Sequence, residues 1–179
     1  MLKTTLISLI IGSFFLLFTL ALAQETAPYS PTPTPVEYTL PYPGLLPDHP
    51  LYFIKHWRDA ILSFLISDPI KKIEFQQLLA EKDLNASIYL AQQHKTDLTV
   101  TTLTQGIANL KKTENYIFAV SASRENKMNN VKDRFEKLVS KYNQVIGTFA
   151  LDFGNQKQIE FHAFQSQINT LSQDFKSKK

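Results

Sequence analysis

The sequence predicts an all-α protein, an antiparallel bundle of four to five helices behind a signal peptide and a proline-rich linker. Three observations support this prediction. Apolar residues recur at alternating spacings of three and four over most of residues 48–179, the period of a helix packed against other helices. Seven of the nine prolines lie within residues 24–47. Near the start of the chain Lys3 is followed by a long uncharged apolar run.

Residues 1–23 are predicted to be an export signal. Lys3 supplies the positive start, and the run from Leu6 to Leu22 carries no charge. The expected cleavage site consists of Ala21, Ala23 and Gln24. The run exceeds the usual signal core of about 7–15 residues, so a retained membrane anchor is the alternative. Either interpretation places the remainder outside the cytoplasm, because Lys3 should stay inside.

A linker is predicted over residues 24–47, in front of a helical domain at 48–179. Proline has no amide hydrogen and a fixed φ, so this segment should be an extended stalk without a core. We favour a passive spacer; a ligand for a proline-recognition module is the alternative.

Composition excludes several classes of protein. The chain has no cysteine, so an exported domain must be held by its core alone, without disulfides, a thiolate metal site or covalent haem. The net charge is +3, and removal of residues 1–23 takes away Lys3 alone among charged residues, which leaves +2. This charge is too small to indicate a nucleic acid or an anionic membrane as partner.

The first helix is predicted over 51–66, with Asp48 as its capping residue and Pro50 at its first position. Its wide apolar arc comprises Leu51, Phe53, Ile54, Trp57, Ile61, Leu62, Phe64, Leu65 and Ile66. Such a helix is usually packed by neighbours on several sides. Docking onto a membrane or a partner is the alternative, and its candidate surface residues are Leu51, Tyr52 and Trp57.

The second helix should start at Pro69 with Asp68 as its N-cap and run to about Gln93. A short connection follows, so the third helix, at roughly 98–123, should return antiparallel. The β-branched opening of this third segment would suit a strand. We still predict a helix, because the three-four spacing extends through Ile117.

The fourth and fifth helices show the clearest periodicity. The fourth carries Met128, Val131, Phe135, Leu138, Tyr142, Val145 and Phe149. The fifth carries Phe161, Phe164, Ile168, Leu171 and Phe175. Gly154 suits a helix stop and Asn155 an N-cap between them, although one bent helix is the alternative.

No catalytic motif stands out, and we expect no enzyme, cofactor or metal. The histidines show neither the His-x-x-x-His nor the Glu-x-x-His spacing that aims two ligands at one metal. The alternative is a small-ligand or metal-binding bundle that uses His56, Asp59 or His162.

Three segments form a recognisable pattern: residues 42–55, which contain Leu-Pro-Asp-His-Pro-Leu-Tyr-Phe-Ile-Lys, the Asp-Pro helix start at 68–69, and residues 79–84. Through them residues 42–95 resemble a bacterial family, domain of unknown function 5667. Asp83 stands where the family tends to have arginine. The resemblance implies export and helices, and it implies no activity.

These observations lead to one functional prediction with two rivals. We expect a non-enzymatic, extracytoplasmic helical domain, secreted or tethered to the outer face of the membrane, that serves as an interaction or structural module for an unknown envelope protein. It would meet the membrane only through an uncleaved N-terminal segment. The rivals are a small-ligand or metal-binding bundle and an envelope chaperone or sensor.

Overall fold

The computed structural model describes residues 36–120, 125–153 and 157–178, and it confirms the all-α prediction. The helices are α2 (Tyr52–Leu65), α3 (Pro69–Gln92), α4 (Thr96–Ala119), α5 (Glu125–Asp152) and α6 (Gln158–Lys178). The described residues contain no strand. None of these helices is both long and apolar enough to cross a bilayer.

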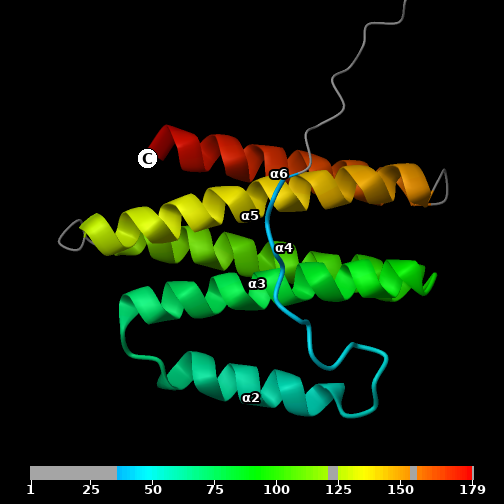
Figure 1. Cartoon of the computed structure of the whole chain (residues 1–179), viewed down its shortest axis with the longest axis horizontal. Helices are drawn as coiled ribbons and strands as arrows, with labels where there is room; N and C mark the ends of the chain where they lie inside the picture. The colour runs from blue at the N-terminus through cyan, green and yellow to red at the C-terminus, as the bar shows by residue number, and fades with distance from the viewer. Residues whose placement is uncertain (1–35, 121–124, 154–156, 179) are drawn as a thin grey trace, which may run out of the picture. The chain divides into compact units, whose positions relative to one another are not determined.

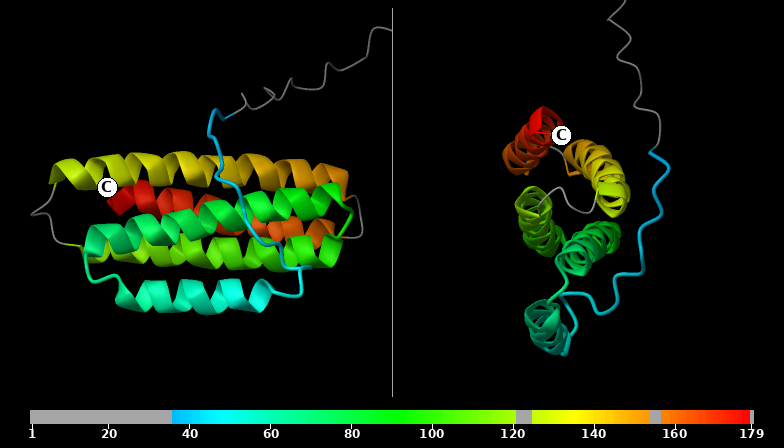
Figure 2. Two further views of the ribbon diagram at one scale, coloured as in Figure 1. Left: turned by 60° about the horizontal axis from the view of Figure 1, so that its bottom comes forward. Right: turned by 90° about the vertical axis from the view of Figure 1, so that its left-hand side faces the viewer.

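Helices α3 to α6 form a four-helix bundle in which successive helices alternate in direction (Figure 1). An end-on view shows these four around a common centre, with α2 lying outside them beside α3 and α4 (Figure 2). The predicted antiparallel return after the second helix is therefore correct. The alternative of one bent C-terminal helix is wrong, because α5 and α6 are separate and run in opposite directions.

The bundle core lies where the three-four spacing predicts it. Every apolar residue singled out on the fourth and fifth predicted helices is buried. On α4 the buried residues include Leu103, Ile107, Leu110 and Ile117. Aromatic contacts join the helices, with ring centroids 4.7 Å apart for Phe135 and Phe175 and 5.8 Å apart for Phe149 and Phe161. The periodic pattern therefore specifies both the helices and their inner faces.

The predicted start of the second helix is confirmed. The Asp68 carboxylate accepts hydrogen bonds from the backbone N–H groups of Ile70 (2.9 Å) and Lys71 (3.0 Å). At the far end His94 adopts a positive φ of 58°, which turns the chain toward α4.

Helix α4 starts and ends earlier than the predicted 98–123. Its threonine-rich opening is helical, and the hydroxyl groups of Thr99, Thr101 and Thr102 donate to carbonyl groups one turn back. Val120 is extended and ends the helix, and residues 121–124 lie outside the described part of the chain.

Two predictions about the first helix are wrong. Asp48 does not cap it and Pro50 is not its first residue: α2 begins at Tyr52 after Leu51, without a side-chain cap. Turns at residues 46–52 separate Asp48 from the helix, and its carboxylate pairs with the Lys95 ammonium instead. The helix is also not packed on several sides, because almost all its apolar residues are exposed.

Residues 36–47 form an extended strap that crosses α5 and α3 before it turns into α2 (Figure 1). The linker was predicted as a stalk without a core, but within these residues Tyr38 and Leu40 pack against the bundle core. Residues 24–35, like the predicted signal and its cleavage site at Ala21, Ala23 and Gln24, lie outside the described residues.

Close packing at Gly106 generates a first prediction. A Cβ atom at Gly106 would lie far inside van der Waals contact of the Tyr142 hydroxyl and 3.2 Å from Asp83 Cβ. Tyr142 is fully buried, and its hydroxyl donates to the Ala80 carbonyl at 2.7 Å, so it is not free to move. Although alanine is the better helix former, we expect Gly106→Ala to lower the free energy of unfolding by about 1–3 kcal/mol.

Urea unfolding of paired variants checks this cause. In a Tyr142→Phe background the clashing oxygen is gone, so Gly106→Ala should cost much less there. Gly147→Ala is the matched control, because a Cβ there meets only Gln165 Oε1 at 3.9 Å. This control should raise stability by up to about 1 kcal/mol. Equal effects at the two glycines would contradict the packing described here.

Candidate functional site

Helix α2 turns its apolar side to solvent. The residues that we call the α2 face, with their exposed fractions, are Phe53 (60%), Ile54 (50%), Trp57 (71%), Ile61 (53%), Phe64 (87%) and Leu65 (64%). At about 100° per residue these six fall within an arc of about 120°, a stripe wide enough to pack against another element. Leu51 and Leu62, at 48% and 38% exposure, extend the stripe.

The opposite, largely polar side of α2 faces the bundle. Tyr52, Asp59 and Ser63 are half-buried, and Lys55 is the one residue of this fully described helix that is buried. These four recur at helical spacing and form a single stripe. The amphipathic helix is therefore inverted relative to an ordinary surface helix, which buries its apolar side.

The ammonium group of Lys55 maintains this orientation. It donates to the backbone carbonyls of Pro43 (3.2 Å) and Leu45 (3.4 Å), and it lies over the Tyr52 ring at 5.2 Å from the centroid. Burial lowers the pKa of Lys55, and the nearby Asp83 carboxylate opposes that shift. Further along the helix, Gln76 of α3 donates to the Ser63 hydroxyl at 3.3 Å. Polar contacts thus attach α2 to the bundle.

A cavity of about 200 Å³ lies between α2, α3 and α4 and is lined mainly by polar side chains. Asp83 is buried in its wall and accepts a hydrogen bond from the Asn109 side chain at 2.8 Å. Burial raises the pKa of Asp83 to about 7, although Lys55 and Asn109 both act to lower it. The buried Oε1 of Gln76 has no hydrogen-bond partner in the structure. The cavity therefore presents acid, base and amide groups together.

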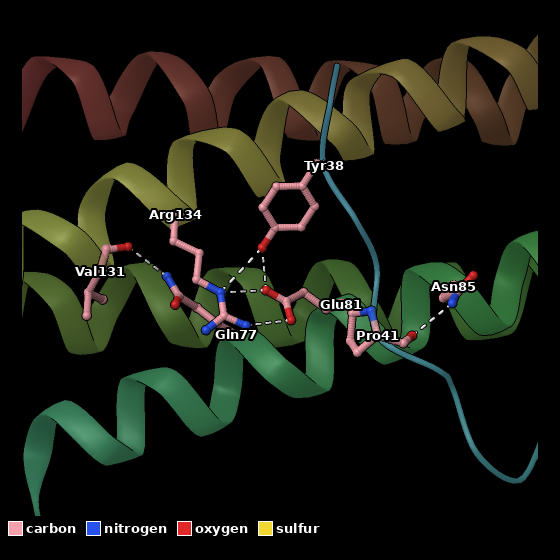
Figure 3. A network of polar contacts seen from close by, with 7 residues as sticks. All are labelled: Tyr38, Pro41, Gln77, Glu81, Asn85, Val131 and Arg134. Carbon is pink, nitrogen blue, oxygen red and sulfur yellow. Dashed lines mark hydrogen bonds and ion pairs between the residues drawn. The ribbon is translucent and has the colours of Figure 1, made fainter. Parts of the chain in front are cut away.

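A second polar network holds the strap to the bundle (Figure 3). The Glu81 carboxylate, with a side chain only 2% exposed, accepts from Arg134 at 2.8 and 2.7 Å, and the Tyr38 hydroxyl donates to it as well. Burial and the hydrogen bond to Glu81 raise the pKa of Tyr38 to about 12. Asn85 donates to the Pro41 carbonyl at 2.8 Å. Strap, α3 and α5 are joined by these contacts.

The residues predicted as a docking surface divide between the two sides of α2. Leu51 and Trp57 are exposed at 48% and 71%, and Trp57 belongs to the α2 face. Tyr52 is half-buried on the polar stripe, where its ring contacts His56 edge-on at 4.9 Å between centroids. The sequence thus predicted the helix correctly, but the residues predicted as a docking surface include members of both its apolar side and its polar side.

The structure does not bring together the three residues of the alternative ligand or metal site, His56, Asp59 and His162. His56 and Asp59 both line the cavity beneath α2, but His162 is exposed on α6. Across residues 36–120, 125–153 and 157–178, no three His, Cys, Asp or Glu side chains are grouped so as to hold a metal ion.

Sequence reasoning missed the polar residues that organise this region: the buried Lys55, Gln77, Glu81 and Asp83, and the exposed Arg134 that pairs with Glu81. One signal was available, because Gln77 and Glu81 occupy positions on α3 where the three-four spacing expects apolar residues. In the structure both are buried, and Gln77 donates to the Val131 carbonyl at 2.9 Å. Polar residues at core positions must find buried partners, so the spacing marked them as contact sites.

The fold and this site define an all-α bundle of four helices with a strapped, inverted fifth helix at its side. The chain belongs to the family described as Domain of unknown function (DUF5667), whose model matches residues 44–146. The match confirms the resemblance and extends it through α4 and most of α5. Neither the curated proteins nor the solved structures include one that matches this chain.

The ion pair between buried Glu81 and exposed Arg134 gives a second prediction. Arg134→Ala leaves the Glu81 carboxylate without its bidentate partner, and because the Arg134 side is open to solvent the free energy of unfolding should fall by about 1–3 kcal/mol. Lys95→Ala is the control, because the side chain of its partner Asp48 is 29% exposed, against 2% for Glu81, so this pair should contribute at most about 1 kcal/mol. Denaturant unfolding of both variants checks this, and equal losses would contradict it.

Asp83 gives a third prediction, about pH. Its pKa is about 7 in the folded chain against 3.8 for an ordinary aspartate. Between these values the folded state holds a proton that the unfolded state has lost, so the contribution of Asp83 to stability is greatest below pH 4 and is lost as pH rises to 7. At about 1.4 kcal/mol per pKa unit, the loss amounts to up to about 4 kcal/mol.

Other carboxylates titrate in the same range, so the measurement is the difference between wild type and Asp83→Asn. In urea unfolding, the free energy of unfolding of the variant should lack this decrease between pH 4 and 7. Parallel pH profiles for the two proteins would show that Asp83 titrates normally.

Proposed function

We propose that this chain is a non-enzymatic protein-interaction module of the cell envelope, and that it binds its partner through the α2 face. One observation carries the proposal: a helix held in place by polar contacts presents six large apolar side chains to solvent. With about 150–250 Å² for each aromatic side chain and somewhat less for each aliphatic one, these six expose on the order of 600–800 Å².

The size of this surface supports an interaction role. The largest apolar patch on an ordinary monomer covers roughly 300–600 Å², and larger patches mark interaction sites. Trp57, Phe53 and Phe64 also belong to the residue types that are enriched at protein interfaces. Export to the envelope follows from the sequence of residues 1–23 and remains part of this proposal.

Site-specific photo-cross-linking in intact cells tests the proposal. A photoreactive phenylalanine analogue replaces Trp57 or Phe64, which keeps an aromatic side chain at the surface. The matched control carries it at Ser140, an exposed residue of α5. We expect both α2 positions to give the same envelope-protein adduct and Ser140 to give none. The absence of α2 adducts, or equal labelling at Ser140, would refute the proposal.

A second candidate function is the binding of a small polar ligand in the cavity beneath α2. The observation that favours it is the buried Oε1 of Gln76, which lacks a partner beside Asp83 and Lys55. A zwitterionic amino acid matches a lining that offers both carboxylate and ammonium groups. Thermal shift with a panel of free amino acids tests this: binding should raise the melting temperature of wild type and not of Asp83→Asn.

A further inference from the structure

The occupant of the α2 face can be argued from four features of the described residues. The first is that the face is fixed outward. Turning α2 over would break the hydrogen bonds from Lys55 to the Pro43 and Leu45 carbonyls and the contact between Ser63 and Gln76. It would also leave the Asp83 carboxylate without the nearby ammonium of Lys55. The apolar stripe therefore stays on the outer side of α2, where no described residue of this chain covers it.

The second feature is the lack of a basic border on α2. Helices that lie in a bilayer surface carry lysine and arginine on their polar side, where these reach the lipid headgroups. Lys55 is unavailable for that role, because it is buried against the bundle and its ammonium is bound to carbonyl groups. Arg58 is the remaining basic residue of α2 apart from His56, and it is paired with Asp59 at 2.7 Å. This charge pattern favours a protein over a lipid surface.

The third feature is the position of Arg58. At about 100° per residue it falls between Leu65 and Leu62, inside the wider apolar arc, and its side chain is 56% exposed. Burial in acyl chains would carry this charge and its Asp59 partner into hydrocarbon. At the rim of a protein interface the same ion pair keeps its contact with water.

The fourth feature is the area. The α2 face exposes on the order of 600–800 Å², so two copies packed face to face would bury roughly 1,200–1,600 Å². Stable, specific protein interfaces bury about 1,200–2,000 Å² in total. One face is therefore large enough to form a complete interface with its own copy. Two-fold pairing uses the same patch twice and closes the assembly.

We propose that the partner of the α2 face is the α2 face of a second copy of this chain, in a two-fold dimer. This inference rests on the proposed function, because it names the partner of that same surface. Trp57 lies near the middle of the paired helices, with Phe53 and Phe64 toward their ends. The four-helix bundles point away from the interface, so the strap and the C-terminal helix stay exposed for other contacts.

Because the chain has no cysteine, a single introduced cysteine gives an unambiguous test in intact cells. Ala60→Cys places a thiol on the exposed flank of the α2 face, and Ser140→Cys on α5 is the matched control. A short bis-maleimide should join two copies through residue 60 and not through residue 140. Mass spectrometry of the product should identify a peptide from α2 linked to itself.

Substitutions within the face identify the contact. Trp57→Glu with Phe64→Glu alters exposed side chains, so circular dichroism should show unchanged helix content, and the melting temperature should match wild type at concentrations where both proteins are monomeric. In sedimentation equilibrium the double substitution should raise the dimer dissociation constant at least about 30-fold, the change expected when central aromatic contacts are lost. A dimer that persists unchanged in this variant would overturn the assignment to α2.

The remaining outcomes distinguish the dimer from the proposed function. A cross-link from residue 60 to a different protein would overturn the dimer and leave the proposed function standing. A monomer that floats with phosphatidylcholine–phosphatidylglycerol vesicles through Trp57 and Phe64 would make lipid the occupant and overturn both. A monomer without α2-dependent adducts or vesicle binding would also overturn both.

Discussion

The buried ammonium of Lys55 is the interaction on which the unusual part of this structure depends. A lysine head group in a protein interior needs hydrogen-bond acceptors, and here the carbonyls of Pro43 and Leu45 supply them. With these hydrogen bonds formed, the polar side of α2 faces α3 and its apolar side is exposed to solvent. In the structure six large apolar side chains thus remain exposed on the side of α2 opposite the buried lysine.

The strap makes that arrangement possible. Its carbonyl groups reach Lys55 only because residues 36–47 are held across α5 and α3, where Tyr38 meets the Glu81–Arg134 pair (Figure 3). Pro41 is held a turn further along α3 by Asn85. The proline-rich composition suits this role, because prolines keep the strap extended and leave its carbonyls available as acceptors. A segment that lacks secondary structure therefore positions a helix.

Buried charge also sets the chemistry beneath α2. Asp83 lies within reach of the electrostatic field of Lys55, yet burial dominates and its pKa rises to about 7. A carboxyl group that titrates near neutrality adjoins the contacts that hold α2. The attachment of α2 and the stability of α3 and α4 are therefore coupled to proton binding at one residue.

The sequence by itself determined the bundle. The three-four spacing located α3 to α6 and their inner faces, Asp68-Pro69 located a helix start, and the opening motif identified the family, because each of these signals is local or periodic along one chain segment. It did not determine the orientation of α2, whose wide apolar arc suggested burial. Only the tertiary structure decided that, since Lys55, the Pro43 and Leu45 carbonyls and Asp83 come from separate segments. The energetic choice between burying a charge with partners and burying an apolar stripe depends on which partners the fold brings within hydrogen-bonding distance.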